Sequence, residues 1–286
     1  MTKCRKKYIK SAIFLSLFLI IVIWALWGNF TVKSTELIID AQTLPDAFNG
    51  YKIAHISDLH NAEFGENNST LIKMLQEQEP DIIAITGDLV DSDHTNMEVS
   101  VEFCRQALQV APCYYVPGNH EAWLGERYNE LENELKDIGV NVLRNESMKL
   151  SSGNDTVWIM GVDDPDFADR SSMFDLSDGI ISKEIEKADA GRGYKILLSH
   201  RPEVFETYVQ EGIDLVLSGH AHGGQVRIPF VGGLVAPNQG FFPEYDGGVY
   251  SRENTHMVVS RGIGNSIIPV RINNRPEIVF VTLHSS

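Results

Sequence analysis

The chain has 286 residues, of which 43% are hydrophobic and 22% charged, and its net charge at pH 7 is −15. This composition predicts a folded globular body rather than a disordered chain. The first thirty residues contain five basic residues and no acidic one, so the rest of the chain is more acidic than the whole. A protein with such an acidic body is a poor non-specific nucleic-acid binder, because that function needs clustered Lys and Arg to neutralise phosphates. We therefore expect no nucleic-acid partner.

The N-terminus predicts a membrane anchor. Residues 1–10 form a basic tail, and residues 11–30 are apolar, with Trp24 and Trp27 near the far end. This stretch is long enough to cross a hydrocarbon core of ~30 Å. A cleaved signal peptide is the alternative, but bulky Trp24, Leu26 and Trp27 stand where a small-residue cleavage site belongs. We favour an uncleaved, single-pass signal anchor in the cell membrane. The positive-inside rule then keeps the N-terminus cytoplasmic and the body on the outer face.

The remainder of the chain alternates between strand and helix patterns. Residues 31–48 are expected to be a connector with a possible strand at 36–39, and residues 49–286 to be one catalytic domain. Helices are expected at 71–78, 97–110, 128–138, 181–188 and 202–209. Strands are expected at 52–56, 81–86, 113–116, 140–143, 157–160, 194–198, 213–217, 226–228, 257–260, 270–272 and 278–283. Mixed βα units followed by strands predict one layered α/β domain.

Five of these strands end in a short polar cluster. The clusters are Asp58-x-His60, Gly87-Asp88, Gly118-Asn119-His120, His200 and Gly219-His220-x-His222. Aligned strand ends converge on one edge of a sheet, so we expect these side chains to meet. The last pair, in its Gly-rich turn, suits metal ligation but is equally compatible with an ordinary polar turn. Five independent clusters favour a functional site.

The chemistry of the clusters indicates a two-metal site. A mononuclear zinc site uses three or four protein ligands, fewer than the candidates here. Two ions that share one carboxylate as a common ligand account better for seven candidate ligands. Oxygen and nitrogen ligands without a C-x-x-C pair favour Mn, Fe, Zn or Co. Two such ions ~3.5–4 Å apart activate a water and clamp phosphate oxygens, which predicts phosphoester hydrolysis.

The same blocks, extended by Asp91 and Glu121, resemble the five motif blocks of the calcineurin-like metallophosphoesterases. Order and spacing match across residues 52–225. Further on, 218–227, 260–264 and 275–278 are similar to the YkuE/YaeI-like branch of bacterial membrane-associated phosphoesterases. The resemblance implies an α/β/β/α sandwich of metallophosphoesterase type behind one N-terminal transmembrane helix.

The resemblance also implies a role for each residue. One divalent transition-metal ion (Mn, Fe or Zn) is then held by Asp58, His60, Asp88 and His222. The second is held by Asp88, Asn119, His200 and His220, with Asp88 bridging. His120 faces the substrate phosphate, where it stabilises charge or protonates the leaving oxygen. The implied enzyme is a membrane-anchored binuclear phosphohydrolase, in which a metal-bridging hydroxide attacks a phosphodiester or a lipid-linked phosphoester.

Two alternatives stay open at this point. One is a pyrophosphate hydrolase of the UDP-2,3-diacylglucosamine type, although an outward-facing domain argues against a cytosolic nucleotide-lipid substrate. The other is a non-catalytic, membrane-tethered metal-binding module, which the complete ligand set and His120 disfavour.

Several other side chains are assigned structural roles. Asp91 and Glu121 are expected to orient ligands or cap turns, and His55 to pack in the core. Cys104 and Cys113 are expected to be unpaired thiols rather than a disulfide. Ordinary surface ion pairs are preferred over phosphate contacts for Arg201, Arg227, Arg261, Arg271 and Arg275. The Gly- and aromatic-rich stretch 230–250 is a substrate loop, a membrane-facing lip or a long connection.

Overall fold

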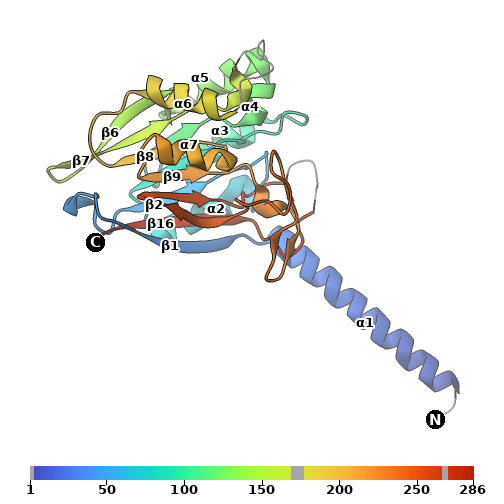
Figure 1. Cartoon of the computed structure of the whole chain (residues 1–286). Helices are drawn as coiled ribbons and strands as arrows, with labels where there is room; N and C mark the ends of the chain where they lie inside the picture. Colours follow the sequence, from blue (N-terminus) through green and yellow to red (C-terminus); the bar gives the residue numbers. More distant parts are fainter. Residues whose placement is uncertain (1–2, 169–176, 266–269) are drawn as a thin grey trace.

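A computed structural model describes residues 3–168, 177–265 and 270–286 (Figure 1). A long helix, α1 (Lys3–Phe30), projects from a layered body. Its segment Ser11–Phe30 has the length and apolar composition needed to cross a membrane.

The first sheet of the body has six strands in the order β1-β16-β2-β3-β4-β5. Their bounds are β1 (Lys33–Ala41), β16 (Glu277–Ser285), β2 (Lys52–Ile56), β3 (Ile82–Thr86), β4 (Cys113–Val116) and β5 (Asn141–Val142). Strands β2 to β5 run parallel to one another, so their carboxyl ends lie at one edge of the sheet. Strand β16 is antiparallel to β2 and parallel to β1.

The second sheet also has six strands, in the order β14-β15-β9-β8-β7-β6. Their bounds are β14 (Gly248–Arg252), β15 (Thr255–Val259), β9 (Leu215–Ser218), β8 (Lys195–Leu198), β7 (Asp155–Gly161) and β6 (Glu146–Ser152). The four central strands are parallel and the two outer ones antiparallel. Two small ribbons follow β9, namely β10 (Arg227–Ile228) with β11 (Gly232–Gly233), and β12 (Val235–Ala236) with β13 (Gly240–Phe241).

Helices cover the outer face of each sheet. The first sheet packs against α2 (Ser69–Gln78), α3 (Met97–Ala107) and α5 (Tyr128–Ile138), and the second against α6 (Ser177–Ala188) and α7 (Phe205–Gln210). The short elements are α4 (Asn119–Trp123), η1 (Asp46–Phe48), η2 (Glu66–Asn68), η3 (Gly125–Arg127), η4 (Pro165–Phe167), η5 (Pro202–Val204) and η6 (His222–Gly224).

Alternation along the strands explains the layers. In β2, Ile53 belongs to the core between the two sheets, whereas its neighbour Ala54 belongs to the core under the helices. In β9, Leu215 and Leu217 face the first sheet and Val216 faces α6 and α7. Because successive strand residues point to opposite faces, a strand buried on both sides is apolar throughout. The expected α/β/β/α sandwich is confirmed.

Several local expectations differ from the structure. Strands β6 and β14 are missing from the expected set, because only Leu150 is buried along β6 and no residue is buried along β14. The strand expected at 270–272 is only a single bridge between Val226 and Ile272. The helix expected at 202–209 begins as the 3₁₀ turn η5. Cys104 and Cys113 are buried free thiols, as expected.

The stretch expected to be a connector is part of the packed body. All nine residues of β1 pair with β16, and Phe48 of η1 is completely buried in the core between the sheets. By contrast, the Ile38 side chain on β1 is 70% exposed. Residues 31–48 therefore contribute to the stability of the fold.

We predict that Phe48→Ala lowers the free energy of unfolding by about 3–5 kcal/mol, because it removes a buried ring from the core. Ile38→Ala is the matched control from the same segment and should change it by less than about 0.5 kcal/mol. Urea unfolding of a chain that begins at Thr31 measures both. If Phe48→Ala changed the free energy of unfolding as little as Ile38→Ala does, this segment would not stabilise the body.

Candidate metal centre

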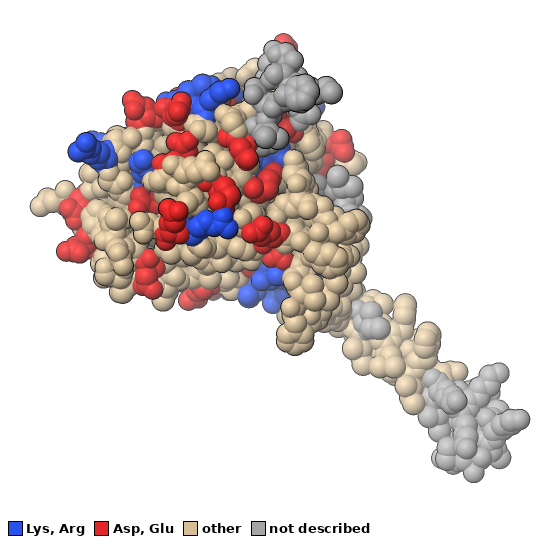
Figure 2. Space-filling view, in the orientation of Figure 1, with Lys and Arg blue, Asp and Glu red and all other residues tan. Residues whose placement is uncertain are grey.

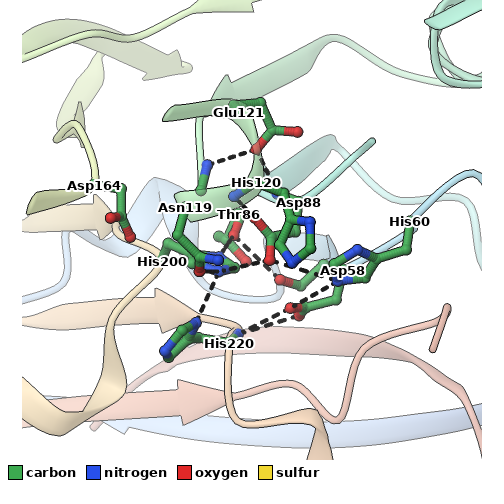
Figure 3. A network of polar contacts seen from close by, with 12 residues as sticks. Asp58, His60, Thr86, Asp88, Asn119, His120, Glu121, Asp164, His200 and His220 are labelled. Atoms are coloured by element: carbon green, nitrogen blue, oxygen red, sulfur yellow. Dashed lines mark hydrogen bonds and ion pairs between the residues drawn. The ribbon is translucent and has the colours of Figure 1, made fainter. Parts of the chain in front are cut away.

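The residues of the five polar clusters come together between the ends of strands from both sheets (Figure 3). Strands β2, β3 and β4 of the first sheet lead into Asp58, His60, Asp88, Asn119 and His120. Strands β8 and β9 of the second sheet lead into His200, His220 and His222. The site therefore uses the edges of two facing sheets, and the expectation of a single sheet edge is wrong.

The first ligand group consists of Asp58, His60, Asp88 and His222, each of which offers one atom within 4.8 Å of the others. The Nε2 atom of His60 lies 3.5 Å from Asp88 Oδ2 and 3.2 Å from His222 Nε2. His222 Nε2 is in turn 3.3 Å from Asp58 Oδ1. All four residues are buried.

The second ligand group consists of Asp88, His200 and His220, again with ligand atoms within 4.8 Å of one another. His200 Nε2 lies 3.2 Å from the same Asp88 Oδ2 atom and 3.1 Å from Asn119 Oδ1. His220 Nδ1 lies 3.2 Å from His200 Nε2. The structure thus brings all seven predicted ligands together, and Asp88 belongs to both groups.

The backbone of these loops is held in an unusual conformation. Five of the seven candidate ligands have positive φ angles: Asp58 (53°), His60 (46°), Asp88 (52°), His220 (67°) and His222 (47°). Non-glycine residues adopt this region rarely and at an energetic cost. Such strain persists where surrounding contacts over-determine it, as they do in these interlocked loops.

Two glycines allow the loops to approach the carboxylates closely. A Cβ atom on Gly219 would lie 1.8 Å from Ser57 Oγ and 2.6 Å from Asp58 Oδ2. A Cβ atom on Gly118 would lie 2.3 Å from Asp88 Oδ1. Since no real side chain fits at such distances, the glycines in these two motifs are required by packing.

Hydrogen bonds orient the histidine rings. His200 Nδ1 lies 2.7 Å from the carbonyl oxygen of Thr86, to which it donates, so its Nε2 atom faces Asp88. The Nε2 atom of His220 lies 3.2 Å from Asn238 Oδ1, and its Nδ1 atom faces the site. Partners of this kind fix the ring orientation and tautomer of metal-binding histidines.

The electrostatics of the cluster suit a cation. Burial lowers the pKa of His60 to about 4 and that of His222 to about 3, so both rings are neutral near pH 7. Burial opposes ionisation of Asp88, but the adjacent histidines hold its pKa well below the ordinary value. Burial likewise opposes protonation of His200, but the charge and hydrogen bond of Asp88 raise its pKa to about 10. Neutral imidazoles around an ionised carboxylate are the forms that bind a metal ion, so His200 would release its proton when an ion binds.

His120 lies next to the seven candidate ligands but is not one of them. Its Nδ1 atom accepts a hydrogen bond from the Ser92 amide at 3.1 Å, so the neutral ring carries its proton on Nε2. The ring packs edge-on against His60, with centroids 4.5 Å apart, and against Trp123. It lies beside the cluster and outside the two groups that share Asp88.

Glu121 braces the loops from behind. Its buried carboxylate accepts hydrogen bonds from the backbone amides of Asp88 (2.8 Å), Gly118 (2.7 Å) and Val90 (3.2 Å). These amides belong to the loops after β3 and β4. Glu121 therefore ties two ligand-bearing loops together.

Asp91 and His55 have the structural roles that were expected of them. Asp91 Oδ1 caps a turn by accepting from the amides of Asp93 and His94, and its Oδ2 is 3.9 Å from His60 Nδ1. His55 is a core residue, buried beside Thr86. Both agree with expectation.

The surface ion pair expected for each arginine is wrong for Arg201 and Arg271, which are buried. Arg201 pairs with Asp164 through two nitrogens and approaches His220 Nε2 at 3.0 Å. Arg271 approaches His222 Nδ1 at 3.4 Å. Each group of histidines thus has a buried arginine behind it.

Sequence reasoning missed Asp164 and Asn238 as neighbours of the site. Asp164 precedes η4, and Asn238 lies in the stretch between β12 and β13. Asp164 stands in the polar pair Asp163-Asp164 shortly after the strand expected at 157–160, so the pattern of strand ends could have marked it. Nothing in the local sequence marks Asn238. Only the tertiary fold brings them to His220 and its neighbour Arg201.

We predict that Glu121→Gln lowers the free energy of unfolding by about 1–3 kcal/mol, since an amide group cannot accept from all three backbone N–H groups. Glu134→Gln is the control, because Glu134 is an exposed glutamate on α5. Thermal or urea unfolding of both variants measures the difference. Indistinguishable stabilities would contradict a bracing role for Glu121.

Comparison with known proteins agrees with this geometry. A family model for calcineurin-like phosphoesterases matches residues 51–224. The uncharacterized metallophosphoesterase YkuE of Bacillus subtilis (strain 168) is 30% identical over 268 residues, which cover 89% of this chain and 86% of that protein. Phosphodiesterase YaeI of Escherichia coli (strain K12) is 30% identical over 237 residues, which cover 82% of each chain.

A transmembrane protein with metallophosphoesterase domain from Danio rerio is 29% identical over 263 residues, which cover 88% of this chain and 57% of that protein. The resemblance to the YkuE and YaeI proteins is thereby confirmed, and α1 together with the transmembrane relative indicates membrane association. The chain belongs to the calcineurin-like phosphoesterase family and is a metallophosphoesterase.

Proposed function

We propose that this protein is a membrane-anchored phosphohydrolase that uses two divalent transition-metal ions, Mn, Fe or Zn, to cleave a phosphoester. The observation that carries the proposal is the position of Asp88. One buried carboxylate belongs to two ligand groups, and the same Oδ2 atom lies near His60 in one and His200 in the other.

The residues divide between the two ions along these groups. Asp58, His60, Asp88 and His222 would hold one ion, and Asp88, Asn119, His200 and His220 would hold the other. When bound, such a pair of ions would activate a water as the nucleophile and supply positive charge for the phosphate oxygens. The seven side chains contribute a fixed set of neutral and anionic donors whose rings and backbone are already oriented.

His120 serves as the group that meets the substrate. The Ser92 hydrogen bonds occupy Nδ1, so Nε2 is the ring nitrogen left to contact a substrate. A hydrogen bond from Nε2 to a phosphate oxygen stabilises the developing charge, and a ring that is protonated on both nitrogens can transfer the Nε2 proton to the leaving oxygen and return to the neutral form; either lowers the barrier to P–O cleavage. This role for His120 favours an enzyme over a non-catalytic metal-binding module.

The substrate class follows from where the enzyme sits. A body attached directly to a membrane helix meets lipid-linked phosphoesters at the surface, and exposed Phe230, Phe241 and Phe242 supply apolar contacts. We therefore propose a phosphodiester or lipid-linked phosphoester as substrate. The basic N-terminal tail keeps the N-terminus cytoplasmic and the catalytic domain on the outer face. That orientation disfavours a cytosolic nucleotide-lipid pyrophosphate.

Asp88→Asn and His220→Ala should each reduce hydrolysis of a chromogenic phosphodiester to near background without unfolding the domain. Asp88→Asn removes the shared charge, and His220→Ala removes a ligand of one ion only. Metal content should therefore fall further in the first variant than in the second. His284→Ala, at an exposed histidine near the C-terminus, is the control. Near-normal turnover by either site variant in metal-replete buffer would contradict the mechanism.

His120→Gln should lower turnover by about 10²–10⁴-fold while the bound metal stays unchanged. The loss should be larger for an alkyl leaving group than for a nitrophenolate, because only the alkoxide needs a proton. Parallel assays on the two ester types, with metal analysis of the same samples, measure both effects. A loss that is equal for the two leaving groups would contradict proton donation by His120.

A further inference from the structure

A basic pocket lies where α1 meets the catalytic body. It has a volume of about 210 Å³ and is lined by two tryptophans and four cations: Trp24, Trp27, Lys33, Arg261, Arg271 and Arg275. None of its described lining residues is an aspartate or a glutamate. The whole chain carries a net charge of −15, so four cations gathered at one point stand out from their surroundings.

The pocket is built jointly by the helix and the body. The Asn29 side chain donates to the Arg271 carbonyl at 2.9 Å and accepts from the Arg271 amide at 2.7 Å. The Arg275 guanidinium stacks on the Trp27 ring, 4.2 Å from its centroid, and donates to the Val32 carbonyl at 3.0 Å. These contacts fix the end of α1 against the body, so the pocket has a defined shape.

The charges of the pocket are only partly neutralised. Arg261 lies 3.6 Å from the carboxylate of Glu277. Over the part of the chain that the structure describes, Lys33 and Arg275 make no salt bridge with a carboxylate within 4.0 Å, and Arg275 donates to the carbonyls of Thr31 and Val32. Arg271 is buried, and its guanidinium already donates to the carbonyls of Arg261 and Gly264 and to the Asn265 side chain, so it contributes charge rather than free donors. A guanidinium with remaining donors, that of Arg275, beside the ammonium of Lys33 is suited to an oxyanion such as a phosphate.

The position of the pocket relative to a membrane identifies the source of that phosphate. The span Ser11–Phe30 has 20 residues, enough to cross a hydrocarbon core of ~30 Å. Trp24 and Trp27 then fall at the membrane interface, where tryptophans are enriched. The cations that share the pocket with them lie at the level of the lipid headgroups.

A second feature supports the same membrane plane. A neighbouring hollow shares Arg261 and Asn273 with the basic pocket, and its rim includes the exposed Phe230. It also contains Glu244 and Asp246, of which Asp246 is paired with Arg227. In Figure 1 the loops between β10 and β14 hang beside the upper end of α1, and Figure 2 shows an uncharged projection of the body next to the helix. A face of the body that carries both apolar loop tips and a basic pocket can contact the acyl boundary and the headgroups of an anionic membrane.

We propose that this pocket binds the phosphate of an anionic phospholipid headgroup, and that the bound lipid fixes the catalytic body against the membrane. The proposal rests on the membrane anchoring of α1 proposed above, but not on any catalytic step. It assigns Lys33 and Arg275 to a lipid and not to the substrate.

The test uses full-length protein in nanodiscs of phosphatidylcholine, with and without phosphatidylglycerol, and native mass spectrometry to count retained lipids. Wild-type protein should retain phosphatidylglycerol in preference to phosphatidylcholine. Lys33→Gln with Arg275→Gln should reduce that preference by about 10- to 30-fold. Lys33→Arg with Arg275→Lys, which conserves both charges, should keep most of it. Arg271 is left unchanged because it contacts His222.

The control variant is Lys73→Gln with Arg105→Gln, which removes two exposed cations from α2 and α3. Both double variants should hydrolyse a soluble phosphodiester at the wild-type rate, which shows that the domain is folded.

Unchanged phosphatidylglycerol preference in the Lys33/Arg275 variant, or an equal loss in the control, would overturn the proposal. Displacement of the lipid by inorganic phosphate at similar concentration would also overturn it, in favour of a free-anion site. Failure of the full chain to enter nanodiscs would overturn both this proposal and the anchoring, whereas insertion without lipid preference would overturn this one alone.

Discussion

The site depends on one buried carboxylate placed between two sets of histidines. Asp88 stands at the end of β3, and its Oδ2 atom lies 3.5 Å from His60 and 3.2 Å from His200, two rings delivered by different sheets. A buried charge of this kind is costly unless it is paired and hydrogen-bonded. The fold satisfies it with histidines on one side and with the His120 amide, 2.9 Å from Oδ1, on the other. Glu121 then holds the Asp88 loop to the neighbouring loop.

Much of this arrangement could be predicted from the sequence, because it follows from local patterns. Apolar runs that end in Asp58, Asp88, Asn119, His200 and His220 mark strand ends, and parallel strands place their ends together. The side-chain types then indicate the chemistry. The seven candidate ligands do meet in space, and the layered α/β/β/α architecture is confirmed.

What could not be predicted depends on long-range packing. Positive φ angles at Asp58 and Asp88 are produced by interlocking loops, not by residue preference. Arg271 has the sequence context of a surface cation but is buried, since it bridges from the end of α1 to His222. The β6 edge strand is polar and short of buried residues, so it lacks the apolar alternation by which strands are recognised. The same long-range packing joins the end of α1 to the body through Asn29 and Trp27.

The central claim is that Asp88 bridges two ions, and electron paramagnetic resonance of the manganese-loaded, full-length protein tests it most directly. Two Mn²⁺ ions that share a carboxylate a few ångströms apart are exchange-coupled, and their spectrum differs from that of isolated Mn²⁺. The account predicts two manganese ions per chain with a coupled spectrum in the wild type. It also predicts that the coupling disappears in Asp88→Asn. One manganese ion per chain with an uncoupled six-line spectrum, or a coupled spectrum that survives Asp88→Asn, would contradict it.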